Sequence, residues 1–449
     1  MSYVSIGGGS IYIGIDDTDS LEGMCTTYLL TELIRELPEL DVIGYPRLVR
    51  LNPMIPWKTR GNGALCIRLG NGGGKKHIIG RIGEKECWGF DAEKRAAFSH
   101  QDIGWIRDRI EGLFDKYAMF DAADTNPAFV ISGGKLPAAL YRDAVRGIVR
   151  LQDAVSCLKK SGAVFRGYKN RRGIIGASAA VSWEPGDRTY EVIAYREIQR
   201  WGTQRRIEHQ SVIKMDKKYG ETFNNYDYEN RHVCIAPSSP CPVLFGIRAE
   251  SPERLPAALG AVRCDEKIGR WIIFETNHGT DDHLQRKKIG KIRGYDCVIA
   301  EGTVCQPPRN IEGGHTIFKI RDQTGEIDCA VYEPSKQFRQ TARKLCLGDM
   351  VTAYGGVRDE PRTINIEKLR VKRLADVRIK VANPMCRACG KRMKSAGRNA
   401  GYRCAVCGKK AAPGTAETKK LKRGIKPGFY EPPPSARRHI SKPLRRFVQ

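Results

Sequence analysis

The stretch Ile11-Tyr12-Ile13-Gly14-Ile15-Asp16-Asp17-Thr18-Asp19-Ser20 decides the fold class of the first part of this chain. Its five leading residues, apolar apart from one glycine, predict a short buried strand. A helical pattern follows at 27–37 and ends at Pro38, and further strands are expected at 42–51 and 63–69. The order strand, helix, strand predicts an α/β block, which we place at residues 1–124.

The acidic half of this stretch is the strongest candidate for chemistry. Asp16, Asp17 and Asp19 place three carboxylates within four residues, and these repel one another unless a cation neutralises them. Ligands of α/β sheets bind beyond the carboxyl ends of strands, and Mg²⁺ prefers carboxylate and phosphate oxygens. The alternative is a turn rich in Asp and Ser that caps the next helix.

Two segments close to the acidic turn are candidates for phosphate contact. Thr26 or Thr27 is expected to cap the helix at its start, where hydroxyl and free N–H groups suit a phosphate, although a plain helix cap fits equally well. A basic, glycine-containing turn just before the strand at 63–69 supplies Lys58, Thr59, Arg60, Gly61, Asn62 and Gly63. Its cations can clamp phosphates, and the alternative is a hairpin turn with exposed cations.

The block at 125–290 is also predicted to be α/β, with helices around 136–159 and 252–262 and strands at 243–249 and 270–276. Its basic loop, which includes Arg171 and Arg172, suits contact with an RNA backbone or is simply solvated. The segment 277–284 contains His278, Asp281 and His283 and can bind a metal, bind a cationic ligand or cap a helix.

The block at 291–376 has the pattern of an OB-fold. Five strands are expected at 298–304, 316–321, 326–332, 350–357 and 365–371, with a helix at 335–347 between the third and the fourth. An OB-fold presents one sheet face to nucleic acid. Phe318, Tyr332 and Phe338 can stack on bases or belong to the core.

The last block, 377–449, contains a zinc-ribbon motif. Cys386, Cys389, Cys404 and Cys407 form CxxC-x14-CxxC, the spacing of a structural zinc site, which requires a reducing compartment. The tail at 409–449 holds 12 Lys and Arg against two Glu, so we expect it to be extended when free and to order on a phosphate backbone.

In the first block, the Gly72-Gly73-Gly74 run is expected to form a flexible turn.

Composition points to a polyanionic partner. The 449 residues carry a formal net charge of +27, a large excess of one sign. No run of about 18 apolar residues and no signal peptide is evident, so we expect a cytoplasmic protein without a membrane span. Nothing in the sequence specifies an oligomeric state.

Long motifs in this chain closely resemble the archaeal tRNA-isoleucine 2-agmatinylcytidine synthetases. They are IGIDDTDS (13–20), GMCTTYL (23–29), RLNPMIPWKTRGNGA (50–64), RRGIIGA (171–177), CPVLFGIR (241–248), EGGHTIF (312–318), YEPSKQFR (332–339) and YEPPPSARRH (430–439). The resemblance implies a multidomain α+β protein: a kinase-like α/β catalytic domain, a ferredoxin-like domain, an OB-fold and a zinc ribbon.

The resemblance also implies the reaction. ATP activates the 2-oxo group of the wobble cytidine in the anticodon of an isoleucine tRNA, and the primary amine of agmatine displaces the activated oxygen. By this resemblance, Asp16, Asp17 and Asp19 would hold Mg²⁺ and position the ATP phosphates. Thr26 would lie beside the transferring phosphate, and residues 58–63 would contact ATP. Asp281 would contact agmatine, and the tRNA would be contacted by Arg171, Arg172, Arg437, Arg438 and His439. The alternative function is a non-catalytic OB-fold and zinc-ribbon protein that binds RNA.

Overall fold

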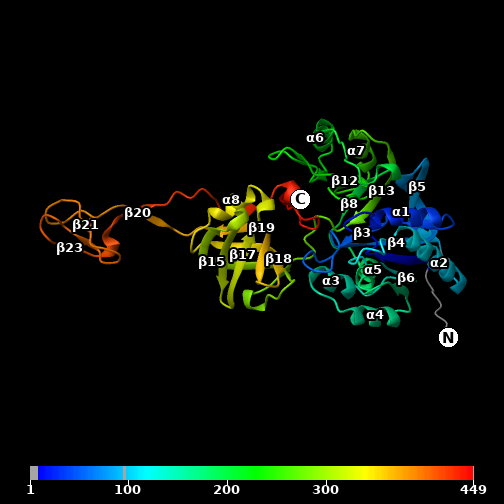
Figure 1. The fold of residues 1–449 in the computed structure, drawn as a ribbon, viewed down its shortest axis with the longest axis horizontal. Helices are drawn as coiled ribbons and strands as arrows, with labels where there is room; N and C mark the ends of the chain where they lie inside the picture. Colours follow the sequence, from blue (N-terminus) through cyan, green and yellow to red (C-terminus); the bar gives the residue numbers. More distant parts are fainter. Residues whose placement is uncertain (1–8, 95–97, 448–449) are drawn as a thin grey trace.

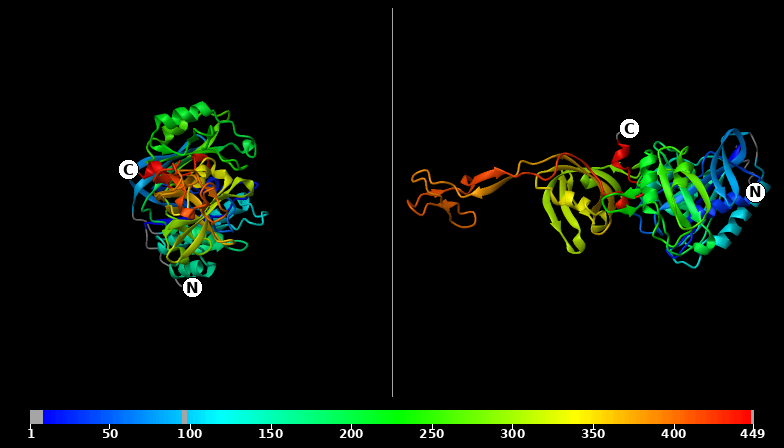
Figure 2. Two further views of the ribbon diagram at one scale, coloured as in Figure 1. Left: turned by 90° about the vertical axis from the view of Figure 1, so that its left-hand side faces the viewer. Right: turned by 90° about the horizontal axis from the view of Figure 1, so that it is seen from above.

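The protein is elongated and has three parts in a row (Figure 1). The computed structural model describes residues 9–94 and 98–447. A large α/β body is followed by a β-barrel, and a small cysteine-bearing unit lies at the far end, while the C-terminus returns to the junction of barrel and body (Figures 1 and 2). Among the described residues, no helix is long and apolar enough to span a membrane.

The α/β body is built on one eleven-stranded sheet. Its central path is, in spatial order, β7 (Val164–Gly167), β6 (Ala128–Ser132), β1 (Ser10–Asp16), β4 (Gly63–Ile82), β3 (Arg47–Arg50), β13 (Ile268–Thr276), β8 (Thr189–Arg196), β12 (Val243–Ala249) and β9 (Thr222–Phe223). Two further strands, β2 (Asp41–Ile43) and β5 (Lys85–Lys94), pair with each other and with β4. Strands from both predicted α/β blocks therefore share this sheet.

Helices cover both faces of this sheet. Alternation along β1 sends Ile11, Ile13 and Ile15 toward one face, where they pack with α1 (Thr26–Glu36) and α2 (His100–Tyr117). Tyr12 belongs to the core of the opposite face, together with residues of α3 (Ala139–Arg146), α4 (Leu151–Lys160) and α5 (Gly173–Ser182). The helices α6 (His209–Lys218) and α7 (Leu255–Ala261) pack against β8, β12 and β13.

Two expectations for the first block were wrong in detail. The strand expected at 42–51 is split into β2 and β3, because Gly44 has a left-handed backbone (φ 74°) and Pro46 follows it. The Gly72-Gly73-Gly74 run is not a turn: it lies inside β4, where Gly72 and Gly73 pair with Glu93 and Ala92 of β5. The partner strand holds Gly72 and Gly73 extended, whereas Gly74 has a left-handed backbone (φ 69°) where the pairing is irregular.

The barrel confirms the predicted OB-fold. Its strands are β15 (Cys297–Asn310), β16 (Thr316–Asp322), β17 (Gly325–Val331), β18 (Met350–Arg358) and β19 (Thr363–Arg373), with α8 (Phe338–Arg343) between the third and the fourth. The sheet closes because β15 pairs with both β16 and β18, and β19 connects β17 with β18. The pairing of β19 with β17 is parallel, and its pairing with β18 is antiparallel. Phe318 and Phe338 are buried in the barrel core and are not free to stack on bases.

The tail is folded, contrary to the expectation of an extended segment. After the small unit, β24 (Glu417–Lys420) pairs with β20 (Arg378–Ala382) and β25 (Gly428–Tyr430) extends the barrel beside β19. Ile440 then inserts into the core of the α/β body. Near its end, Lys442 and Arg446 pair with Asp187 and Glu250, and Arg446 also donates to the Gly279 carbonyl, which offsets part of the charge repulsion that the sequence suggested.

Candidate active site

The acidic cluster lies at the carboxyl end of β1, as predicted. Asp16 is the last residue of that strand and pairs with Ala128 of β6. Asp17 has a left-handed backbone (φ 57°), and its carboxylate accepts hydrogen bonds from the Thr59 hydroxyl at 2.8 Å and the Asn126 backbone N–H at 2.9 Å. The acidic turn is thus joined directly to the basic loop.

The carboxyl groups at this strand end resist ionisation. Burial raises the pKa of Asp16 well above its ordinary value, and the charge of Asp17 raises it further. Burial raises the pKa of Asp17 to about 6, although its hydrogen bonds from Thr59 and Asn126 oppose that rise. A bound cation would relieve this repulsion, so the donor set fits a hard divalent ion that also takes phosphate oxygens.

Arg60 links the basic loop to the start of α1. Its guanidinium forms an ion pair with the Asp19 carboxylate and donates to the Met24 carbonyl at 2.7 Å. Burial alone would lower the pKa of Arg60, but the Asp19 charge, the nearby Cys25 and the hydrogen bond to Asp19 together outweigh it, and the pKa is raised. The Thr26 hydroxyl donates to Asp19 at 3.3 Å and accepts from Thr18 at 3.1 Å. Thr26 therefore lies within the same cluster.

The helix cap differs from the prediction. Neither threonine caps α1: Thr26 is its first helical residue and Cys25 holds the N-cap position without a side-chain cap bond. The Thr26 hydroxyl is thus committed to the acidic cluster and not to the helix backbone.

One pocket unites the two predicted segments. It is lined by Asp16, Asp17, Asp19 and by Lys58, Thr59, Arg60, Gly61, Asn62 and Gly63. The sequence reasoning missed the remaining lining residues, which are Leu51, Ile55, Trp57, Gly173, Ile175 and Gly176; Arg172, also in the lining, was predicted only as a tRNA contact. Gly176 approaches so closely that a Cβ there would lie 1.9 Å from an Asp16 carboxylate oxygen. The start of α5 thus forms a wall of the pocket.

Two of the loop residues are turned toward neighbouring protein groups. The Lys58 ammonium donates to the Ile55 carbonyl at 3.3 Å, and burial followed by the nearby Arg438 charge lowers its pKa. The Asn62 amide donates to the Asn52 carbonyl at 2.9 Å, which fixes the loop beside β3.

The residues predicted for tRNA contact differ in exposure. Arg171 is exposed. Arg437 is held by Asn224, Glu431 and the Pro432 carbonyl. These contacts occupy much of its hydrogen-bonding capacity inside the protein.

The next two residues of the tail lie closer to the pocket loop. Arg438 pairs with Glu367 at 3.0 Å and stays partly exposed. His439 is exposed, and it lies near Gly61 while its ring packs 5.3 Å from that of His278. The C-terminal segment thus reaches the edge of the pocket.

Asp281 already has cationic and amide partners within the chain. Its carboxylate accepts from the Lys368 ammonium at 2.9 Å and from the Lys442 backbone N–H at 2.7 Å. Its side chain is 15% exposed. An agmatine contact at this residue would have to share or displace the Lys368 interaction.

The two histidines of 277–284 do not form a metal site. His278 accepts from Arg50 at 2.6 Å and contacts Glu191 at 3.0 Å, whereas His283 contacts Glu367 of the barrel. Burial lowers the pKa of His278 to about 3, so its ring is neutral. These are buried structural contacts between strands and between blocks.

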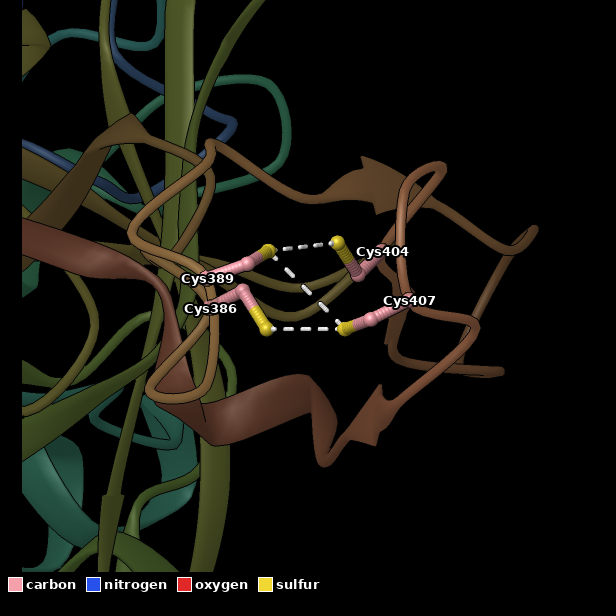
Figure 3. A group of neighbouring side chains, drawn as sticks. All are labelled: Cys386, Cys389, Cys404 and Cys407. Carbon is pink, nitrogen blue, oxygen red and sulfur yellow. Dashed lines mark hydrogen bonds between the residues drawn. The ribbon is translucent and has the colours of Figure 1, made fainter.

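The four ribbon cysteines gather as predicted (Figure 3). Their sulfur atoms lie within 4.8 Å of one another, and no other group of three or more His, Cys, Asp or Glu in the described parts of the chain does so. Hydrogen bonds from the backbone of Cys407 and Val406 lower the pKa of Cys404 to about 6, which favours the thiolate that zinc binds. Four sulfur ligands leave no open position, so this site is structural.

Comparison with known proteins accounts for nearly the whole chain. Four family models match: the TiaS TCKD domain at 12–170, the TiaS FLD domain at 171–283, an OB-fold nucleic acid binding domain at 290–372 and the TiaS C-terminal zinc ribbon domain at 383–425. The 2-agmatinylcytidine synthetase TiaS of Methanocaldococcus jannaschii is 42% identical over 97% of this chain and 98% of its own.

Solved structures of TiaS resemble the protein at full length. A TiaS complex with its isoleucine tRNA and ATP is 39% identical, covers 97% of both chains and has a TM-score of 0.82. A complex with tRNA, an ATP analogue and agmatine is 36% identical, covers 98% of both chains and has a TM-score of 0.79. This chain therefore belongs to the TiaS family of tRNA 2-agmatinylcytidine synthetases.

Proposed function

We propose that this protein joins agmatine to carbon 2 of the wobble cytidine in an isoleucine tRNA anticodon, at the expense of ATP. The observation that carries the proposal is the single pocket in which the acidic turn and the basic loop of this chain meet. The full-length likeness to TiaS enzymes crystallised with tRNA, ATP and agmatine supports the same conclusion. The phosphate that activates the 2-oxo group leaves with that oxygen when the agmatine amine attacks.

We assign the phosphate chemistry to the acidic turn. Asp16, Asp17 and Asp19 would hold Mg²⁺ together with phosphate oxygens of ATP, which neutralises charge on the transferring group. Among the described residues the three carboxylates do not gather closely enough to hold an ion by themselves, so phosphate oxygens would have to complete its ligand set. Thr26, hydrogen-bonded to Asp19, is assigned to the position beside the transferring phosphate.

The remaining contacts follow the charge of the surrounding loops. Residues 58–63 are assigned to ATP. When ATP binds, Arg60 would give up part of its ion pair with Asp19 and contact a phosphate oxygen instead. Arg171, Arg172, Arg437, Arg438 and His439 are assigned to the tRNA, with His439 the most accessible of the tail residues. Asp281 is assigned to the agmatine guanidinium, which would have to share the carboxylate with Lys368.

The same proposal covers the domains and the location in the cell. We propose a kinase-like catalytic domain and a ferredoxin-like domain before the OB-fold, and a cytoplasmic site of action. The strands β6 and β7 follow residue 124, and β6 pairs with β1 while β7 pairs with β6. This favours a boundary between the first two domains near residue 170, where the family models meet. The later boundaries stay near residues 290 and 376.

The test is mass spectrometry of an isoleucine tRNA after incubation with the protein, ATP and agmatine. The cytidine in the anticodon should gain the mass of agmatine less one water, and only when ATP is present. Asp17→Asn should abolish this product, whereas Asp108→Asn, on the exposed face of α2, should not. Tight RNA binding with no product would favour the non-catalytic alternative.

A further inference from the structure

Trp57 is an exposed aromatic side chain in the lining of a polar pocket. Its side chain is 46% exposed, although it lies on the same loop as Thr59 and Arg60. A ligand that covered this indole ring would gain the free energy of burying its apolar surface.

Arg172 lies over the ring of Trp57. The guanidinium carbon is 3.9 Å from the ring centroid, a close cation–π contact. In the described parts of the chain no carboxylate lies within ion-pair distance of Arg172, unlike Arg60, and burial lowers the pKa of its guanidinium. Its in-plane N–H groups are therefore available to a ligand.

The loop that carries Trp57 joins the barrel to the acidic turn. At its barrel end the Asn52 amide donates to the Tyr295 carbonyl at 2.9 Å, and Asn52 accepts from the Cys297 thiol. At its other end Thr59 donates to Asp17. An RNA loop held by the barrel would therefore reach Trp57 on its way to the carboxylates.

We propose that Trp57 and Arg172 form a stacking platform for the target cytidine of the tRNA once it has left its stack. This inference rests on the proposed function and names the side chains that position its substrate. An indole ring can stack on a pyrimidine whatever its hydrogen-bonding edge, and Arg172 can donate to the base or to its phosphate. The platform would hold carbon 2 near the phosphoryl group and compensate for the lost stacking.

Steady-state kinetics with an anticodon stem–loop RNA test the platform. Trp57→Ala should raise KM for the RNA roughly 5- to 150-fold, the range for loss of one base–aromatic stack, and Trp57→Phe should restore most of it. The KM for ATP should stay within about twofold. The matched control is Trp88→Ala, which removes another exposed indole under a cation, Lys76, on the β4–β5 hairpin.

The outcomes distinguish the two bases that could stack on Trp57, the cytosine of the tRNA and the adenine of ATP. An unchanged KM for RNA would overturn the proposal, and so would a rise in KM for ATP equal to or larger than that for RNA, which would assign the ring to adenine. If the wild-type protein itself makes no agmatinylated product, the proposed function fails instead.

A fluorescent RNA gives a readout that does not depend on turnover. The probe is the same stem–loop with pyrrolo-cytidine, whose emission is quenched by stacking, in place of the wobble cytidine. With agmatine and a non-hydrolysable ATP analogue present, so that the reaction cannot proceed, binding to the wild type and to Trp57→Phe should quench the probe. At saturating protein, the Trp57→Ala complex should leave the emission of the probe close to that of the free RNA. Equal quenching by all three proteins would contradict the proposed stacking on Trp57.

Discussion

At the scale of single residues, the site depends on one close approach between a helix and a carboxylate. Gly176 of α5 faces Asp16, and a Cβ at this glycine would come within 1.9 Å of the carboxylate oxygen and 3.3 Å of Ala64. Contacts this short cannot persist, so either Asp16 must rotate or α5 must move.

We therefore predict that Gly176→Ala lowers kcat at least tenfold, since a misplaced catalytic group costs about that factor or more. It should also lower the free energy of unfolding by about 1–3 kcal/mol through overpacking. Product formation and urea unfolding measure the two effects.

Gly112→Ala, in α2, is the control because a Cβ there meets nothing within 4 Å. It should leave activity unchanged and stabilise the fold by about 0.5–1 kcal/mol. A fully active Gly176→Ala would contradict the assigned role of this approach.

The sequence predicted part of this site at the residue scale. The acids and the basic loop were predicted because charge density and glycine spacing are visible along the chain. Trp57 and Gly176 were missed because their importance comes from packing: Gly176 lies in a helix about 160 residues after the acid that it faces. The role proposed for Asp281 could not be refined either, since its partner Lys368 lies in another part of the protein.

At the scale of elements, short apolar and alternating segments were predicted well, whereas long-range pairing was not. The strands at 243–249 and 316–321 and the helix near 27–37 appear where their patterns indicate. The length of β4 and the folded tail depend on partners: β5 stabilises the first, and acidic side chains of the α/β body hold the second. Such partners cannot be read from a local window of sequence.

The tail yields a prediction at this scale. The buried Arg446 guanidinium pairs with Asp187 at 2.9 Å and Glu250 at 2.6 Å and donates to the Gly279 carbonyl. Arg446→Ala should lower the free energy of unfolding by about 1–3 kcal/mol, because it leaves the buried Gly279 carbonyl and the partly buried Glu250 carboxylate without this donor, while Asp187 keeps Lys442. Arg445→Ala, its exposed neighbour, should change stability by less than about 0.5 kcal/mol. Equal values in urea unfolding would show that the tail contributes nothing specific through Arg446.

At the scale of the whole molecule, the three parts have cores of very different size. The α/β body and the barrel each hold a large apolar cluster, whereas the buried members of the ribbon core are only Cys386, Met393, Tyr402 and Cys404. Three two-residue strands, β21 (Lys394–Ser395), β22 (Tyr402–Arg403) and β23 (Lys410–Ala411), cannot hold that unit together without a cross-link. Its folding should therefore depend on zinc.

Removing zinc should consequently unfold the ribbon alone. With a zinc chelator present, backbone amides of residues 386–411 should lose protection in hydrogen-exchange mass spectrometry, while those of β1 and α5 keep theirs. Cys404→Ser should reproduce the loss and reduce bound zinc, and Cys305→Ser, on a barrel strand, should do neither. Because no residue of the α/β body belongs to the ribbon core, its exchange has no reason to change. Loss of protection in β1 in step with the ribbon would mean that the two parts fold as one unit, against the separation of their cores.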